Sequence, residues 1–164
     1  MASTLKFDQW QSTAGINRQT ILQVVNSVYS GYASTNSTSY VAVGLSASIT
    51  PYYATSKILI LVNMQGLENT GGSGTWLASQ IWKNGSSLQA LDNVANYVGG
   101  AGNNSQNYYG SVSTSFLDSP ATTAATTYAI YWKARSGATI YINNYADVGS
   151  GSTISTMTLL EIAQ

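Results

Sequence analysis

The sequence predicts a single all-β domain, a β-sandwich of about eight strands in which a jelly roll is the expected form. Short apolar or alternating segments recur along the chain between turns rich in Gly, Asn, Pro and Ser, and no window shows capped helical periodicity. The chain has 164 residues, of which 44% are hydrophobic, and this is enough for one buried core. We therefore expect a β-sandwich domain over residues 20–164, preceded by an extended N-terminal arm over residues 1–19.

The expected arm is polar apart from three apolar side chains, Leu5, Phe7 and Trp10. This pattern predicts a segment that anchors itself on its own domain or on a neighbour, and a frayed terminus is the alternative. The chain does not open with a basic stretch followed by an apolar run, so we expect no signal peptide. No apolar stretch reaches the roughly 18 residues that span a bilayer, so no membrane insertion is expected.

In the first half of the domain we expect four strands. Residues 21–25 form a short apolar run, and residues 40–49 end in an alternation that stops at Pro51 and places Leu45, Ala47 and Ile49 on one face. Residues 57–64 are apolar on both faces, which is typical of a central strand. Residues 76–82 precede Asn84-Gly85, a dipeptide that strongly predicts a two-residue hairpin turn.

The second half predicts four more strands. Residues 108–117 alternate, with Tyr108, Gly110, Val112, Thr114 and Phe116 on one face. Residues 127–135 and 138–143 predict a second hairpin around Ser136-Gly137, with Ile140 and Ile142 facing away from Tyr141 and Asn143. The last strand, 153–162, places Ile154, Thr156, Thr158, Leu160 and Ile162 on one face. The longest irregular stretches are expected over 66–74 and 98–106.

Charge is scarce in this chain and is evenly balanced. Six Lys and Arg residues offset six Asp and Glu residues, and charged residues make up 7% of the sequence, against about 25% in an ordinary soluble domain. The basic residues are mostly scattered, which argues against nucleic acid and anionic membranes as partners. A surface with so little charge is either partly buried in an oligomer or solvated through hydroxyl and amide groups.

Several kinds of catalytic site are excluded because the chain contains no His and no Cys. Glycoside hydrolysis would need two facing carboxylates, but Asp118 is expected to cap a turn, and Asp92 and Asp147 are expected to lie in loops. Glu161 can pair with a Lys or Arg across the sheet. No loop has the dense Asp spacing of a calcium site. We therefore expect no enzymatic activity, no metal and no cofactor.

Aromatic residues are abundant, with twelve Tyr and four Trp. Those on expected strands are interpreted as packing in the core or in a subunit interface: Tyr128, Tyr131, Tyr141, Trp76 and Trp82. Those around the Gly/Asn loop are candidates for stacking on a sugar or contacting a protein, because a Tyr ring offers a flat apolar body with a polar end. The candidate binding residues are Tyr97, Asn103, Asn104, Tyr108 and Tyr109.

Several segments together resemble a family of phage virion proteins, described as tail-fibre or structural proteins of phages of aquatic bacteria. The resemblance lies in residues 21–25 (ILQVV), 56–62 (SKILILV), 116–123 (FLDSPATT), 136–143 (SGATIYIN) and 154–162 (ISTMTLLEI). It implies a jelly-roll homotrimer that is made in the host cytoplasm and displayed on the virion, and it supplies no catalytic residues. More loosely, the strand pattern is similar to that of the C1q and tumour-necrosis-factor trimers.

The resemblance implies a tail-fibre or receptor-binding module that contacts a host glycan or protein. This chain differs from a long tail fibre because it has no extended shaft and no large anchoring domain before the sandwich. Residues 1–19 are then the expected attachment to other virion proteins. A capsid decoration protein that stabilises the phage head is the alternative, and a glycan-cleaving enzyme that uses Asp118 or Asp92 is a distant one.

Overall fold

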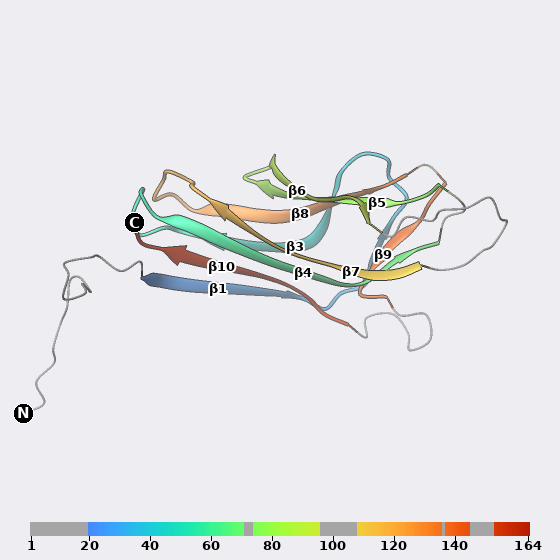
Figure 1. Ribbon diagram of the computed structural model, residues 1–164, viewed down its shortest axis with the longest axis horizontal. Coiled ribbons are helices and arrows are strands. Elements are labelled where there is room, and N and C mark those ends of the chain that lie inside the picture. The colour runs from blue at the N-terminus through green and yellow to red at the C-terminus, as the bar shows by residue number, and fades with distance from the viewer. Residues whose placement is uncertain (1–19, 71–73, 96–107, 136, 145–152) are drawn as a thin grey trace, which may run out of the picture.

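The computed structural model describes residues 20–70, 74–95, 108–135, 137–144 and 153–164, and for residues 92–95 and 108 it describes the backbone alone. These residues form ten β-strands in two antiparallel sheets that pack together, as Figure 1 shows. The predicted all-β fold and β-sandwich are therefore confirmed. The described residues include no helix that could cross a membrane. The expected arm, with Leu5, Phe7 and Trp10, lies outside the described residues.

One sheet has six strands and the other has four (Figure 1). The six-stranded sheet runs in the order β1 (Ile21–Tyr29), β10 (Ser155–Ile162), β4 (Lys57–Asn69), β9 (Ile140–Ile142) and β2 (Ala33–Thr35), and β7 (Tyr108–Asp118) pairs with β4 on the side away from β10. The four-stranded sheet runs in the order β3 (Val41–Ile49), β8 (Thr126–Ala134), β5 (Leu77–Lys83) and β6 (Ser86–Ala95).

The eight longer strands pair in a nested pattern. From the outermost pair inward, β1 pairs with β10, β3 with β8, β4 with β7, and β5 with β6, all antiparallel. The innermost pair is the predicted Asn84-Gly85 hairpin, which is confirmed. Asn84 has a φ of 49° and Gly85 a φ of 82°, the positive values that a two-residue turn of this kind needs at both central positions.

Alternate residues of the two sheets point into the space between them and form the core. The predicted inward face of β3 is confirmed, because Leu45, Ala47 and Ile49 are all buried. Tyr128 and Trp132 on β8 are the two largest side chains that are fully buried. The core also includes the inward residues of β4, which are Ile58, Ile60, Val62 and Met64.

The structure shows which face of β4 and of β10 meets the other sheet, a choice that the sequence pattern leaves open. Along residues 57–64 of β4 one face is buried, whereas on the other face Leu59 is half-buried and Leu61 is 40% exposed. On β10 the inward residues include Met157 and Leu159, so the face that includes Ile154 and Leu160 points outward. A period of two fixes which residues share a face, but it does not fix which face meets the other sheet.

The predicted hairpin around Ser136-Gly137 is wrong, because β8 and β9 belong to different sheets. The amide of Ala138 donates to the carbonyl oxygen of Arg135 at 3.0 Å, and Gly137 has a φ of 85°, so a tight turn carries the chain from one sheet to the other. Turn residues between two apolar runs therefore mark the turn correctly, but they do not say that the two runs pair with each other.

Strand β4 continues to Asn69, into the stretch that was expected to be irregular from residue 66. The strand passes through a bulge between Met64 and Leu67, where Gly66 has a φ of 56°. Strand β2 was not predicted, and Asp92 lies within β6 rather than in a loop. The bulge at Gly66 sets which residues of β4 face outward between Gly66 and the end of the strand.

Candidate functional site

Asn143 organises the end of the six-stranded sheet where the bulge lies. Its side chain is fully buried, and its Nδ2 donates to the carbonyl oxygens of Tyr29 at 2.7 Å and Gly31 at 2.9 Å. Its Oδ1 accepts a hydrogen bond from Ser155 Oγ at 2.8 Å. The next residue, Asn144, donates its amide to the carbonyl oxygen of Gly66 at 3.0 Å. These contacts hold Asn144 against β4 at Gly66, which lies two residues before Glu68 in the chain.

Glu68 lies between two tyrosines in one row across the sheet. It is directly opposite Tyr109 on β7 and Tyr141 on β9, and directly opposed residues in neighbouring strands share a face. The hydroxyl group of Tyr109 donates to Glu68 Oε1 at 3.4 Å, and Asn144 Nδ2 donates to Glu68 Oε2. Under these neighbours Glu68 is only 2% exposed.

Tyr32, between β1 and β2, adds a third ring. Its ring centroid lies 5.7 Å from that of Tyr141, with the planes tilted by 31°. Burial, the neighbouring Tyr141 and the negative charge of Glu68 raise the pKa of Tyr32. Tyr32 is 44% exposed and Tyr109 is 40% exposed, so both side chains reach solvent. We call Tyr32, Glu68, Tyr109, Tyr141 and Asn144 the Glu68 site.

The Glu68 site combines a buried carboxylate with neutral donors. The hydrogen bonds to the carboxylate come from a hydroxyl group and an amide group. Within the described ranges, the one ion pair is that between Lys83 and Asp118. Among these residues the site therefore carries a negative charge that no cation offsets, beneath tyrosine rings that solvent can reach.

Of the predicted binding residues, the structure places one in this site. Tyr109 lies in it, whereas only the backbone of Tyr108 is described, at the start of β7. Tyr97, Asn103 and Asn104 lie outside the described residues. Sequence reasoning missed Tyr32 and Glu68 as site residues. It did predict that Tyr141 faces away from Ile140 and Ile142, which is correct, but the partners of Tyr141 depend on strand register.

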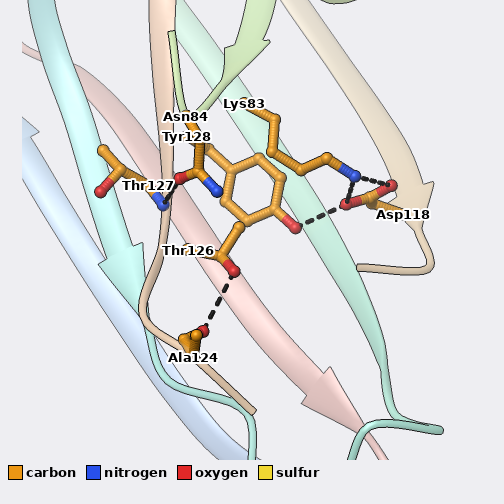
Figure 2. Close-up of polar contacts among 7 residues, drawn as sticks. All are labelled: Lys83, Asn84, Asp118, Ala124, Thr126, Thr127 and Tyr128. Atoms are coloured by element: carbon orange, nitrogen blue, oxygen red, sulfur yellow. Dashed lines mark hydrogen bonds and ion pairs between the residues drawn. The ribbon is translucent and has the colours of Figure 1, made fainter. Parts of the chain in front are cut away.

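Asp118 joins the two sheets instead of capping a turn, so that prediction is wrong. It ends β7 with 6% exposure, and Lys83 Nζ lies 3.1 and 2.9 Å from its two carboxylate oxygens (Figure 2). The hydroxyl group of Tyr128 donates to Asp118 Oδ2 at 2.7 Å. Lys83 and Tyr128 belong to the four-stranded sheet and Asp118 to the six-stranded sheet. Burial and the hydrogen bond to Asp118 raise the pKa of Tyr128 far above its usual range.

Glu161 is held by neutral donors, so the predicted pairing with Lys or Arg is also wrong. It is fully buried, and it accepts hydrogen bonds from Gln23 Nε2 at 2.6 Å and from the backbone amides of Tyr52 at 2.8 Å and Tyr53 at 3.4 Å. Burial acts to raise the pKa of Glu161, but these hydrogen bonds outweigh it and hold the pKa below its usual value. The group closes one end of the sandwich.

Most of the remaining strand aromatics lie on the outer side of the four-stranded sheet. Trp82 stacks on Tyr131 with 4.0 Å between the ring centroids and 11° between the planes. Lys133 Nζ lies 4.7 Å from the centroid of the Tyr40 ring and 5.9 Å from that of Trp76. All of these side chains are half-buried. Of the aromatics interpreted as core residues, Tyr128 is confirmed as one.

An apolar row crosses the outer face of the six-stranded sheet. Register places Val24 of β1, Leu160 of β10, Leu59 of β4 and Leu117 of β7 side by side. Val24 is 57% exposed and Leu117 is 47% exposed. Other exposed large apolar residues on or beside this sheet are Ile21, Val28, Leu61 and Ile154, and within the described ranges the four-stranded sheet has none. We call the four residues in register the apolar row.

No group of three or more acidic side chains that could hold a metal ion occurs in the part of the chain that the structure describes. No protein-family model matches the chain, and no curated protein matches its sequence. The β-sandwich is thus established by the structure, whereas the phage-virion resemblance stays a prediction.

Proposed function

We propose that this protein is a non-enzymatic structural component of a phage virion that associates with copies of itself and contacts the host surface through the Glu68 site. The apolar row is the observation that carries the proposal. Val24 and Leu117, at the two ends of the row, are each about half exposed. An exposed apolar strip that crosses four neighbouring strands is typical of a surface that another protein covers.

A second copy of the chain is the partner that this surface fits best. The outward side chains next to the row include the hydroxyl and amide groups of Asn26, Thr158 and Ser115, and charge is scarce throughout the chain. Such a face offers little to a charged partner and little like-charge repulsion to a copy of itself. Three copies are proposed because the virion resemblance implies a trimer.

The nested strand pairing supports the proposed jelly roll. In a jelly roll, an antiparallel pair of four-strand segments is rolled into two sheets, so the first strand pairs with the eighth and the fourth with the fifth. The pairs β1–β10, β3–β8, β4–β7 and β5–β6 follow this order. This order is also what the likeness to the C1q and tumour-necrosis-factor trimers implies.

Placing charge on the apolar row tests self-association. A double variant, Val24→Lys with Leu117→Lys, should reduce the sedimentation-equilibrium mass from that of a trimer to that of a monomer. Both positions are already half exposed, so the monomer should stay folded. Tyr53→Lys is the matched control, because Tyr53 is 59% exposed and lies in the β3–β4 connection rather than on a strand of the row. An unchanged mass for the double variant would argue against this interface.

Copy number per particle tests where on the virion the protein acts. A few dozen copies or fewer, found on the tail by labelled antibody, are expected for a fibre or receptor-binding module. Hundreds of copies on the head would favour the capsid decoration alternative. In either case, deleting residues 1–19 should prevent incorporation into particles if this segment attaches the protein to other virion proteins.

The described residues lend no support to the glycan-cleaving alternative. Asp118 is already engaged by Lys83 and Tyr128, and Asp92 lies within β6. A carboxylate that holds two sheets together is poorly suited to approach a sugar, because moving it would disturb the packing of Tyr128.

A further inference from the structure

We infer that the Glu68 site binds a ligand that carries an ammonium group. The inference deepens the proposed function, because such a group would be the part of the host surface that the protein recognises, and its biological use rests on that proposal. The binding itself is a property of the isolated chain. Three features of the site carry the inference: its charge, its rings and the way its polar groups are already used.

The charge of the site calls for a cation. Glu68 is 2% exposed, and the groups that donate to it, Tyr109 and Asn144, are neutral. A buried carboxylate is stabilised far more by a cation than by neutral donors alone. The ammonium group of a bound ligand would supply the positive charge that the described residues around Glu68 lack.

The rings are placed to receive that cation. Tyr109 and Tyr141 stand on the two strands that flank β4 at Glu68, so their backbones are about 10 Å apart across the sheet. A cation is attracted by a ring face within roughly 6 Å of the ring centroid, and Glu68 has a tyrosine on each side from which such a contact can come. Tyr32, whose ring packs against Tyr141, extends the aromatic surface.

The polar groups of the site favour an ammonium ligand over a neutral sugar. A sugar hydroxyl group needs donors and acceptors that point toward the ligand. Here the Tyr109 hydroxyl group and the Asn144 amide donate to the carboxylate beneath them. The site therefore places tyrosine rings beside a buried negative charge, a combination that suits a methylated or primary ammonium group.

Titration with matched cationic and neutral probes tests the inference. Choline is compared with 3,3-dimethylbutanol, its uncharged isostere, and glucosamine with N-acetylglucosamine, using calorimetry on the full chain. We expect each cation to bind at least about tenfold more tightly than its neutral partner. Tighter binding of choline than of glucosamine would point to a quaternary ammonium group on the host, and the reverse order to an amino sugar. Absence of binding, or equal binding within each pair, would overturn the inference.

Three variants assign the binding to this site. Glu68→Gln keeps the shape and removes the charge, so it should lose about tenfold in affinity for the cation. Tyr32→Phe keeps the ring and should bind as the native protein does, whereas Tyr32→Leu should lose about fivefold. Because Tyr32 is 44% exposed, both Tyr32 variants should fold. Full affinity in Glu68→Gln, or equal affinity in the two Tyr32 variants, would contradict the assignment.

The same samples separate this inference from the proposed function. Glu68→Gln lies away from the apolar row, so it should keep the native sedimentation mass while losing the cation. A trimer that binds no ammonium probe would overturn the inference alone. A monomer that binds the probe would overturn the proposed self-association, and it would still support the inference that the site binds an ammonium group.

Discussion

Tyr128 donates its hydroxyl hydrogen to Asp118 at 2.7 Å, and this bond links the fully buried ring of one sheet to the last residue of a strand in the other (Figure 2). Lys83 neutralises the same carboxylate from the end of β5. The three side chains combine an acid, a base and a hydroxyl group. The burial of Tyr128 and Asp118 makes this group a structural clamp between the sheets.

The clamp predicts how stability depends on alkaline pH. The pKa of Tyr128 is raised in the folded protein, whereas in the unfolded chain it returns to its ordinary value of about 10.0. The stability that Tyr128 contributes is therefore complete below pH 10 and is lost as the pH rises further. Each such tyrosine lowers the free energy of unfolding by about 1.4 kcal/mol per pH unit in that range.

Tyr128→Phe is the variant that isolates this effect. It should lower the free energy of unfolding by about 1–2 kcal/mol at pH 8, because the hydrogen bond to Asp118 is lost. Urea unfolding at pH 8, 10 and 11 should then show a shallower decline than in the native protein. Some decline should remain, because the pKa values of Tyr32 and Tyr40 are also raised. An identical decline in both proteins would contradict the role given to Tyr128.

Glu161 should contribute to the loss of stability at acid pH. Its pKa is lowered in the folded protein from the ordinary value of 4.5, so its contribution to stability is present above pH 4.5 and is lost as the pH falls through the lowered pKa of the folded protein. Glu161→Gln should reduce the loss of stability between about pH 5 and pH 3. Thermal unfolding followed at several pH values in this range measures it. If the variant loses as much stability as the native protein over this pH range, then carboxyl groups other than Glu161 cause the loss of stability in acid.

The surroundings of Gly66 and Gly85 predict that Gly66→Ala and Gly85→Ala differ in stability. A Cβ at Gly66 would lie 2.6 Å from Thr153 Oγ1 and 2.9 Å from backbone atoms of Asn144, whereas one at Gly85 would meet nothing within 4 Å. Both glycines have positive φ, so Gly66→Ala and Gly85→Ala share a strain of about 1–2 kcal/mol. Gly66→Ala should lose at least about 1 kcal/mol more through overpacking. Equal losses, measured by urea unfolding, would show that the bulge adjusts freely.

The fold class was accessible from sequence because it depends on local signals. Alternation marked the inward face of β3, and Asn84-Gly85 marked a turn whose conformation depends on those two residues. The strands with which β8 pairs, β3 and β5 rather than β9, could not be predicted from local signals. The turn at Gly137 changes sheets, and that outcome depends on the packing of the whole sandwich rather than on the turn residues.

The candidate site was only partly accessible, because it is assembled by register. Glu68 meets Tyr109 and Tyr141 only after the bulge at Gly66 has shifted β4. The acids that were assigned by local context failed for the same reason. Asp118 is bound by Lys83, 35 residues away, and Glu161 by Gln23, 138 residues away. Neighbours along the sequence carry no information about such partners.

The sedimentation-equilibrium mass of the native full-length chain tests the central claim of self-association most directly. We expect a mass three times the 17.3 kDa of one chain, held at micromolar protein concentration and at high salt, because the apolar row contains no charge to screen. A mass of 17.3 kDa at every concentration would contradict it.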